Sequence, residues 1–197
     1  MIVVGITGKY CAGKTTAADI LIEAGYEGID VDALGHDALR REKERIIERF
    51  GSQVAGGGGE IDRRRLGRVV FSDSAALRDL ESIVHPGMVA AVEEQIAEFR
   101  ALNPGPAGVA VNAAVLFRMG LTRLCDLVLY IHAPFPIRYR RARERDHANF
   151  LGVARRLRSQ RDVVPQFWGL DADIHSVQND GSREQLRAKL EALLSIP

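Results

Sequence analysis

The stretch Gly8-Lys9-Tyr10-Cys11-Ala12-Gly13-Lys14-Thr15 fits the pattern G-x-x-x-x-G-K-[ST]. It follows the apolar run Ile2-Val3-Val4-Gly5-Ile6, which predicts a short buried strand, and it leads into residues 15–23, which have a helical pattern. A strand before the pattern and a helix after it are the context that this motif needs. The sequence therefore predicts a phosphate-binding loop (P-loop) at the end of the first strand.

Each residue type in this loop has a physical task. Gly8 and Gly13 allow backbone conformations and a close approach to a ligand that a Cβ atom would obstruct. Lys14 reaches the β- and γ-phosphates of a nucleotide, and the Thr15 hydroxyl can complete a Mg²⁺ shell. The backbone N–H groups and the N-terminus of the helix that begins at Lys14 stabilise the same anion.

The composition is that of a globular protein rather than a disordered one. The chain has 197 residues, of which 46% are hydrophobic and 27% charged, enough for one domain or for a core domain with insertions. The net charge is only +1, but many arginines gather in one stretch: Arg138, Arg140, Arg141, Arg143, Arg145, Arg155, Arg156, Arg158 and Arg161. This stretch predicts a polyanionic ligand. Interleaved aromatic residues are missing and the rest of the chain is not basic, so we do not expect nucleic acid to be that ligand.

The two cysteines and the apolar runs indicate a cytoplasmic protein without a membrane partner. Cys11 and Cys125 show no C-x-x-C spacing, and no run approaches the ~18 apolar residues of a membrane span. Cys11 lies beside Lys14 and a helix N-terminus, which favour a reactive thiolate. A small residue that fills space is the alternative for Cys11.

Strand and helix patterns alternate along the chain, which predicts a parallel sheet with helices on both faces. Further strands are expected at 27–31, 109–111, 127–131 and 174–177. The last helix is expected at 182–194, with Ser182 and Gln185 as a capping box. In such folds ligands bind at the carboxyl edge of the sheet.

Two regions interrupt the alternation. Residues 37–100 form one long, mainly helical excursion, broken by the turn at 56–59 and by His85-Pro86. Residues 134–160 contain all but one of the arginines named above, and we expect this segment to close over phosphates as a lid, with a solvated charged face as the alternative. The predicted architecture is thus a single three-layer α/β unit of 197 residues, with core segments 1–36, 101–133 and 161–197.

Asp30 and Asp32 flank Val31 at the end of the second predicted strand. A carboxylate at that edge can accept the proton of a substrate hydroxyl during phosphoryl transfer. Asp32 also suits the N-cap of the following helix. The spacing alone leaves both roles open.

At this point the chain resembles the dephospho-CoA kinases, P-loop enzymes of the nucleotide-kinase type, over nearly its whole length. The loop through Thr16 is similar to the opening loop of that family, and 29–32 to its Asp-x-Asp strand end. The most specific similarity is a series in the long insertion: an Asp-Arg in 61–67, a Phe-Ser-Asp in 70–73 and a Leu-Glu-x-Ile-x-His-Pro in 80–86. Parts of the arginine-rich stretch and residues 179–182 resemble the family lid and its last loop.

The resemblance implies transfer of the γ-phosphoryl group of ATP to the ribose 3′-hydroxyl of dephospho-CoA, which gives CoA and ADP. The residues implied to bind ATP are Gly8, Lys9, Tyr10, Cys11, Ala12, Gly13, Lys14, Thr15, Thr16, Asn179 and Gly181, with the last two bordering the adenine. Thr15 would hold Mg²⁺. Asp32 would be the base at the 3′-hydroxyl, and Arg141 and Arg145, with Lys14, would neutralise developing charge. Arg63 and His85 would lie on the acceptor side with Asp32.

Some of these residues also have simpler interpretations. His85 is equally compatible with a surface histidine before a proline turn. Asn179 and Gly181 are compatible with a plain turn before a helix.

The chain departs from the family pattern after the third predicted strand. Where the family usually has Asp-x-Pro-Leu-Leu-Phe-Glu, this chain has Asn112-Ala113-Ala114-Val115-Leu116-Phe117-Arg118. Arg118 reverses the charge near the expected acceptor site, and Asn112 lacks a carboxylate that could steer Mg²⁺-bound water. Three interpretations stay open: a rearranged acceptor site with Arg118 in it, a weakened activity, or a shift of one or two residues in the correspondence.

Other functions fit the sequence less well. A GTP-binding switch would use residues 32–35 as D-x-x-G, but no N-K-x-D guanine motif is present. A kinase of another small hydroxyl acceptor shares the loop and the arginines, yet the insertion at 37–100 is large for that task. A weakened nucleotide-binding regulator is favoured only by Asn112 and Arg118. Oligomeric state and nucleotide preference are not encoded in any motif of this chain.

Overall fold

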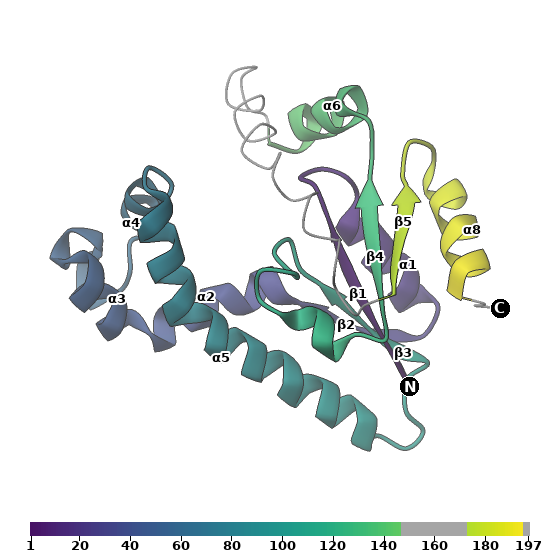
Figure 1. Cartoon of the computed structure of the whole chain (residues 1–197), viewed down its shortest axis with the longest axis horizontal. Coiled ribbons are helices and arrows are strands. Elements are labelled where there is room, and N and C mark those ends of the chain that lie inside the picture. The colour runs from purple at the N-terminus through teal and green to yellow at the C-terminus, as the bar shows by residue number, and fades with distance from the viewer. Residues whose placement is uncertain (147–172, 195–197) are drawn as a thin grey trace. The chain divides into compact units, whose positions relative to one another are not determined.

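The computed structural model describes residues 1–146 and 173–194. Figure 1 shows helices and strands in the following order. They are β1 (Ile2–Gly8), α1 (Lys14–Glu23), β2 (Tyr26–Asp30), α2 (Val31–Arg41), α3 (Lys43–Phe50), η1 (Ser52–Val54), η2 (Gly57–Gly59), α4 (Arg63–Val70), α5 (Ser74–Ala101), β3 (Gly108–Asn112), η3 (Leu121–Leu124), β4 (Leu127–His132), α6 (Phe135–Asp146), β5 (Ile174–Gln178) and α8 (Arg183–Leu194).

The chain forms two compact units. Residues 1–30 and 96–197 make up the first, which we call the sheet unit, and residues 31–95 make up the second, which we call the helical unit. The predicted lid extends beyond the described residues, because only 134–146 of its range belongs to them. Arg155, Arg156, Arg158 and Arg161 lie outside the described part of the chain.

The sheet unit contains a five-stranded parallel sheet in the order β2-β3-β1-β4-β5. The α/β fold expected from the alternating pattern is confirmed, including the strand at 174–177. The central strand β1 has buried side chains from Val3 onward, as parallel strands covered on both faces require. Strands β1, β3 and β4 carry almost uninterrupted apolar sequences for the same reason.

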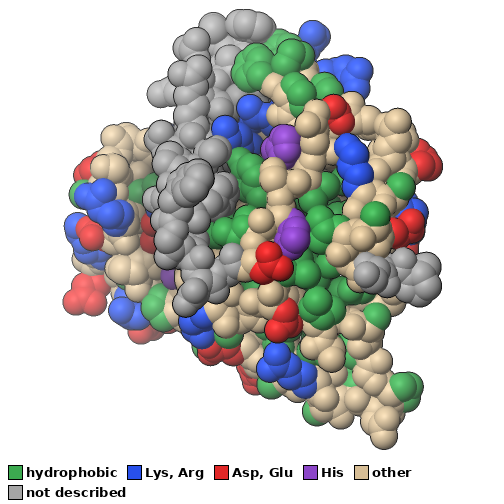
Figure 2. Space-filling model, turned by 45° about the vertical axis from the view of Figure 1, so that its right-hand side comes forward, with side chains coloured by type: hydrophobic (Ala, Val, Ile, Leu, Met, Phe, Trp, Pro, Cys, Tyr) green, Lys and Arg blue, Asp and Glu red, His purple; other side chains and the backbone are tan. Residues whose placement is uncertain are grey.

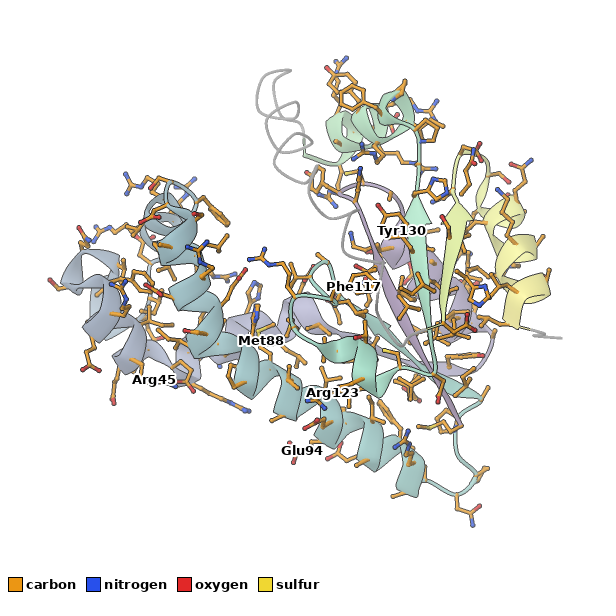
Figure 3. The ribbon with its side chains drawn as sticks, in the orientation of Figure 1. Arg45, Met88, Glu94, Phe117, Arg123 and Tyr130 are labelled. Carbon is orange, nitrogen blue, oxygen red and sulfur yellow. The ribbon has the colours of Figure 1, made fainter. Side chains whose placement is uncertain are left out.

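Helices α1 and α8 pack on one face of this sheet. Their buried residues share a core with strand residues of that face: Val4, Ile6, Ala17, Ala18, Ile20, Leu21, Ala110, Leu129, Ile131, Val177, Leu186 and Leu190. Glu23 of α1 also accepts a 2.8 Å bond from Arg183 of α8. On the opposite face a Cβ at Gly5 would lie 2.8 Å from Cys125 Sγ and 3.1 Å from Leu116, so the segment after β3 packs closely there. In Figure 3, Phe117 and Arg123 mark this segment and Tyr130 marks β4.

The helical unit consists of α2, α3, α4 and most of α5, whose apolar side chains form its interior. Figure 3 labels Met88 and Glu94 along α5. Asp62 caps α4 by accepting bonds from the backbone N–H groups of Arg64 and Arg65 at 2.9 and 3.0 Å. These hydrogen bonds to the charged carboxylate lower the pKa of Asp62, with the Arg65 contact as the main cause.

The predicted break at His85-Pro86 is wrong, because α5 runs without interruption from Ser74 to Ala101. A proline inside a helix costs about 3 kcal/mol through a lost hydrogen bond and a steric clash. Side chains on both sides of Pro86 are at least 91% buried: Ile83, Val84, Met88, Val89 and Val92. Burial of one such side chain contributes about 1.5–3 kcal/mol, so the apolar face outweighs the proline.

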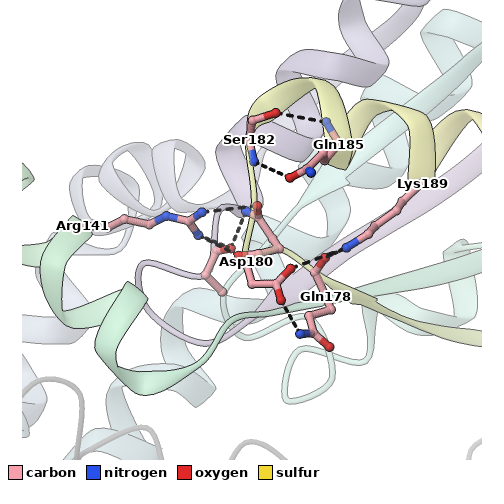
Figure 4. Close-up of polar contacts among 8 residues, drawn as sticks. Arg141, Gln178, Asp180, Ser182, Gln185 and Lys189 are labelled. Carbon is pink, nitrogen blue, oxygen red and sulfur yellow. Dashed lines mark hydrogen bonds and ion pairs between the residues drawn. The ribbon is translucent and has the colours of Figure 1, made fainter.

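The predicted capping box at the start of α8 is confirmed. Gln185 N–H donates to Ser182 Oγ at 3.3 Å, and Ser182 N–H donates to Gln185 Oε1 at 2.9 Å (Figure 4). Nearby, Lys189 Nζ donates to the carbonyl of Gln178 at 2.6 Å. These bonds fix the loop 179–181 between β5 and α8. In the part of the chain that the structure describes, no helix combines the length and apolar composition of a bilayer span.

Candidate active site

The P-loop follows β1 and needs glycine at Gly8. The φ angle of Gly8 is +149°, and a Cβ atom there would lie 2.1 Å from the carbonyl oxygen of Ile131 on β4. The loop then turns, with the N–H of Ala12 donating to the carbonyl of Lys9 at 3.0 Å. Cys11 has a φ of +56°, a left-handed conformation that residues other than glycine seldom adopt. The backbone of the loop is thus bent sharply at both of its ends and at its tip.

Gly13 occupies the N-cap of α1, with a φ of +100° and no side-chain cap on the helix. A Cβ atom at Gly13 would lie 2.1 Å from Asn179 Nδ2. The N-cap residue of α1 therefore caps none of its first N–H groups with a side chain, and the helix dipole favours an anion at this end. The structure supports the predicted need for glycine at this position.

Lys14 is the first residue of α1, and its ammonium group lies back over the loop. Its Nζ donates to the carbonyl oxygens of Gly8 at 3.1 Å and Lys9 at 3.5 Å. Thr15 and Thr16 follow in the first helical turn, and Thr15 is exposed. The lysine and the threonine hydroxyl therefore lie at the same helix end that is open to phosphate.

Three arginines share one face of α6, because Arg138, Arg141 and Arg145 are spaced i, i+3 and i+7. Arg141 Nη1 donates to the carbonyls of Ala12 and Asn179 at 3.3 and 3.1 Å, and its Nη2 donates to Asn179 Oδ1 at 3.3 Å (Figure 4). The Arg145 guanidinium carbon lies 4.6 Å from the centre of the Tyr10 ring, a cation–π contact. Helix α6 thus brings two of the predicted catalytic arginines to the P-loop.

Sequence reasoning placed Arg138 in the arginine-rich stretch but gave it no role of its own, and the structure shows it only 7% exposed. Its Nε donates to the carbonyl of Ala133 at 3.1 Å. Burial lowers the pKa of Arg138, and the ionisable groups of Tyr130 and Cys11 act in the opposite direction. The spacing i, i+3, i+7 in the arginine-rich stretch was the signal that could have identified it.

Asn179 ties the loop between β5 and α8 to the P-loop. It is 5% exposed, and its Nδ2 donates to the carbonyl of Ala12 at 2.8 Å. Its backbone N–H donates to the carbonyl of His132 at the end of β4. A Cβ at Gly181 would lie 1.7 Å from Gln185 Oε1, so a larger residue there would displace the end of the Gln185 side chain. The predicted contact of Asn179 and Gly181 with adenine stays a prediction.

Polar residues also end the neighbouring strands of the sheet. Asp30 is the last residue of β2 and pairs in register with Asn112, which pairs with Ile6 of β1. Both side chains therefore belong to the carboxyl edge that carries the P-loop. Arg118 is exposed in the segment that follows Asn112. Its predicted acceptor contact stays a prediction.

A magnesium ion fits this edge by its chemistry. Among the described residues, no three His, Cys, Asp or Glu side chains gather into a metal-binding set. Mg²⁺ bound with a nucleotide needs only one or two protein oxygens, because water and phosphate oxygens complete its octahedron. The exposed hydroxyl of Thr15 satisfies that requirement.

The remaining predicted residues belong to the helical unit. Asp32 is the second residue of α2, where its charge also stabilises the helix N-terminus rather than capping it from outside. Arg63 begins α4, and its Nη1 lies 2.5 Å from Nε2 of His36. An arginine can only donate, so His36 Nε2 is the acceptor in this contact. His85 is half-buried within α5.

Sequence reasoning also missed His36. It follows Asp32 by four residues on α2, so the two lie on one face of that helix. That i, i+4 spacing from a predicted catalytic carboxylate was the available signal. The helical unit therefore joins two predicted acceptor elements, α2 and α4, through the His36–Arg63 contact.

One face of the molecule carries side chains of both charges (Figure 2). On the face that Figure 2 shows, blue Lys and Arg side chains lie among red Asp and Glu side chains and green hydrophobic ones. This distribution agrees with a net charge of +1.

Comparisons with known proteins agree with this geometry. A sequence model described as dephospho-CoA kinase matches residues 2–184. A dephospho-CoA kinase of Moorella thermoacetica is 31% identical over 195 residues, which cover 98% of this chain and 90% of the relative. The crystal structure of TT1252 from Thermus thermophilus has a TM-score of 0.80 at 32% identity and covers 98% of this chain and 96% of the other.

A more distant structure shares the fold alone. The shikimate kinase from Acinetobacter baumannii has a TM-score of 0.51 at 16% identity, over 99% of this chain and 94% of the other. It supports a P-loop kinase architecture and says nothing of the acceptor. The match to the family model and the full-length relatives show that this chain belongs to the dephospho-CoA kinase family.

Proposed function

We propose that this chain transfers the γ-phosphoryl group of ATP to the ribose 3′-hydroxyl of dephospho-CoA, which gives CoA and ADP in the last step of CoA biosynthesis. The observation that carries this function is the family match over residues 2–184. It is supported by the positive φ angles of Gly8, Cys11 and Gly13 in the P-loop. The reaction class is phosphotransfer to an alcohol.

The donor phosphates bind to the P-loop. Loop amides from Gly8 to Thr16 and the open N-terminus of α1 supply N–H donors, and Lys14 adds a mobile positive charge. Lys14 Nζ now bonds to the carbonyls of Gly8 and Lys9, at 3.1 and 3.5 Å, and phosphate oxygens would take the place of these acceptors. Thr15 would hold Mg²⁺, which neutralises charge on the phosphates when it is bound.

Arg141 and Arg145 act on the charge of the transferred group. Their support is the packing of α6 on the P-loop, through the Arg141 bonds to Ala12 and Asn179 and the Arg145 contact with Tyr10. A guanidinium held in advance beside the loop needs little reorganisation when negative charge develops. We assign both arginines to stabilisation of the transition state.

Asp32 is the base at the acceptor. The 3′-oxygen of dephospho-CoA attacks the γ-phosphorus, its proton passes to the Asp32 carboxylate, and the bond to the bridging oxygen breaks to release ADP. The exposure of Asp32 at the start of α2 supports its access to a substrate hydroxyl.

Arg63, His85 and Arg118 bind the acceptor. Dephospho-CoA carries a pyrophosphate, and guanidinium groups match phosphate oxygens in a bidentate way. Arg63 has a fixed partner in His36, which supports a defined orientation of its guanidinium. Arg118 replaces the family glutamate, so its positive charge would be used in a rearranged contact with the same anionic acceptor.

A product assay tests this function. Purified protein is incubated with MgATP and dephospho-CoA, and CoA and ADP are measured by mass spectrometry, with one control without acceptor and one without ATP. We expect CoA only when both substrates are present. ADP release without CoA, in the presence of dephospho-CoA, would contradict the proposed acceptor. Absence of both products would contradict the kinase activity itself.

A further inference from the structure

Tyr10 lies at the tip of the P-loop, on a turn whose ends are held by hydrogen bonds. The N–H of Ala12 donates to the carbonyl of Lys9 at 3.0 Å, which makes Tyr10 and Cys11 the central residues of a four-residue turn. The carbonyl of Ala12 in turn accepts a 2.8 Å bond from Asn179. These bonds fix the backbone that carries the Tyr10 side chain.

The Tyr10 ring meets one face of α6. It is partly buried and packs against Ala142, which is fully buried. Arg145 follows Ala142 by three residues, so the two lie on the same face of the helix. The Arg145 guanidinium carbon lies 4.6 Å from the centre of the Tyr10 ring, within the ~6 Å range of a cation–π contact. Because alanine is small, the ring can lie close to the helix and beside the arginine.

An aromatic ring holds a cation without neutralising it. The attraction is between the positive charge and the face of the ring, and it needs no hydrogen bond from the N–H donors of the guanidinium. A carboxylate partner would instead cancel the positive charge and occupy two of those donors. The Tyr10 ring therefore takes from Arg145 neither the charge nor the donors that phosphate oxygens require.

Arg145 needs such a contact because it is exposed near the C-terminal end of α6. A long, exposed side chain has many rotamers and loses conformational entropy when it is confined to one geometry. Charge that is already in place stabilises a transition state best, since no reorganisation is needed at the moment of reaction. A contact that restricts Arg145 in the folded enzyme therefore lowers the barrier to the transfer step.

We propose that Tyr10 is a positioning residue for phosphoryl transfer, whose ring orients the Arg145 guanidinium beside the P-loop before the reaction begins. Tyr10 acts on the transition state through Arg145, in addition to the backbone contact with ATP expected of the loop. The P-loop motif leaves residue 10 unspecified, so this role belongs to the aromatic side chain of this chain. The inference rests on the proposed function, in which Arg145 stabilises the transition state.

Two substitutions of Tyr10 separate orientation from packing. Leucine fills much of the space beside Ala142 but has no ring face for a cation, whereas phenylalanine keeps the ring and loses only the hydroxyl. Tyr139 supplies the matched control, because it packs against the same Ala142 but stacks on Phe135, with the ring centres 6.2 Å apart. Tyr139→Leu therefore disturbs the same cluster without removing the Tyr10 ring.

The test is a double-mutant cycle in the full-length protein. CoA formation is measured for the wild type, Tyr10→Leu, Tyr10→Phe, Tyr139→Leu and Arg145→Gln, and for each aromatic substitution combined with Arg145→Gln. Initial rates at varied MgATP separate kcat from the KM for ATP, and thermal unfolding checks that each variant is folded. A purely structural effect of Tyr10 would persist without the Arg145 side chain, so only an effect that vanishes there is assigned to positioning.

We expect Tyr10→Leu to lower kcat by about two- to fivefold, the factor that corresponds to an exposed cation–π contact, without a change in the KM for ATP. In the Arg145→Gln background the same substitution should have no further effect on kcat. Tyr10→Phe should keep the coupling to Arg145. Tyr139→Leu should change kcat by the same factor in both backgrounds.

A second measurement follows the contact without any activity. The Arg145 Nε–H signal is identified in a proton–nitrogen correlation spectrum by its loss in Arg145→Gln. The ring current of Tyr10 should shift this proton signal upfield in the wild type and in Tyr10→Phe. The shift should disappear in Tyr10→Leu and persist in Tyr139→Leu.

An equal loss of kcat from Tyr10→Leu with and without the Arg145 side chain, a loss of the coupling in Tyr10→Phe, or an Arg145 signal that Tyr10→Leu does not move would each overturn the proposal. If Tyr10→Leu fails to fold, the wild type and Tyr10→Phe must still show the upfield signal, and its absence has the same consequence. A wild-type protein that makes no CoA contradicts the proposed function instead, and the signal then decides whether Tyr10 orients Arg145.

Discussion

Asn179 Nδ2 donates a 2.8 Å hydrogen bond to the carbonyl of Ala12, a residue 167 positions earlier in the chain. The same nitrogen lies where a Cβ atom of Gly13 would have to go, at 2.1 Å. One buried amide therefore holds the P-loop and also excludes any side chain at its last glycine. The shape of the phosphate site depends on this contact between two loops as much as on the P-loop sequence.

Glycine at position 13 is needed for two reasons, its positive φ and its crowded Cβ position, and comparison with two other glycines distinguishes them. Gly13 has a positive φ and a crowded Cβ position, Gly120 has a positive φ with open space, and Gly57 has open space without a positive φ. We expect Gly57→Ala to be nearly neutral and Gly120→Ala to cost about 1–2 kcal/mol. Gly13→Ala should lower the free energy of unfolding by about 1–3 kcal/mol more than Gly120→Ala does, because its Cβ also clashes with Asn179.

Urea unfolding of the three variants measures these costs. In an Asn179→Ala background, the cost of Gly13→Ala should fall toward that of Gly120→Ala, since the clash is gone and the φ strain remains. An unchanged cost in that background would show that Asn179 is not the obstacle.

Lys14→Ala should lower kcat by at least about 10²-fold, because a positive charge on the transferred phosphoryl group is lost. The fold should survive, since Lys14 is only partly buried and its ammonium donates to carbonyls of the loop. Steady-state CoA formation and a thermal melt measure the two effects. Lys43→Ala, which removes an exposed 3.5 Å pair with Glu60, is the control and should leave both unchanged. Wild-type turnover of Lys14→Ala would contradict its catalytic role.

Asp32→Asn should lower kcat by about 10²- to 10⁴-fold with little change in the KM for ATP, because it removes a base and no donor contact. Asp37→Asn is the control on the same helix, where Asp37 pairs with Arg40 at 3.3 Å on the surface. Initial rates at varied ATP separate kcat from KM. Equal kcat values for the two variants would assign the proton transfer to another group.

Arg118→Glu should raise the KM for dephospho-CoA by about tenfold, which corresponds to about 1.4 kcal/mol of binding free energy. The substitution places a negative charge against the anionic acceptor, and the KM for ATP should stay the same. Arg123→Glu, at an exposed position a few residues further on, is the control. If Arg118→Glu instead improves acceptor binding, the family glutamate has the same role here and the arginine weakens the enzyme.

Cys125 should make the protein less stable at alkaline pH. Burial raises its pKa to about 12 in the folded state, whereas an unfolded thiol ionises near pH ~8.5. The stabilisation is therefore complete below that pH and is lost as the pH rises toward 12, at about 1.4 kcal/mol per pH unit. Urea unfolding of the wild type and Cys125→Ser between pH 8 and pH 11 (about the accessible range) measures the difference. If the free energy of unfolding falls with pH equally in the wild type and in Cys125→Ser, the assignment of Cys125 as a buried thiol is wrong.

The sequence predicted the features that depend on local chemistry. The glycines of the P-loop, the apolar strands and the Ser182 capping box are each set by neighbours in the chain, so their patterns are readable from one sequence. The break expected at His85-Pro86 was the exception, because burial along α5 outweighs the local cost of the proline. The motifs in the long insertion were specific enough to indicate the family, which the comparisons show.

Only the tertiary structure decided which distant residues meet at the site. The bonds of Asn179 and Arg141 to Ala12 join segments more than a hundred residues apart, and the burial of Arg138 turns one face of α6 inward. No local pattern fixes such contacts, because they depend on the register of the strands and on how α6 packs. The sequence by itself therefore determined the phosphate loop and the family, and the packing of α6 and the loop after β5 determined which side chains hold that loop in place.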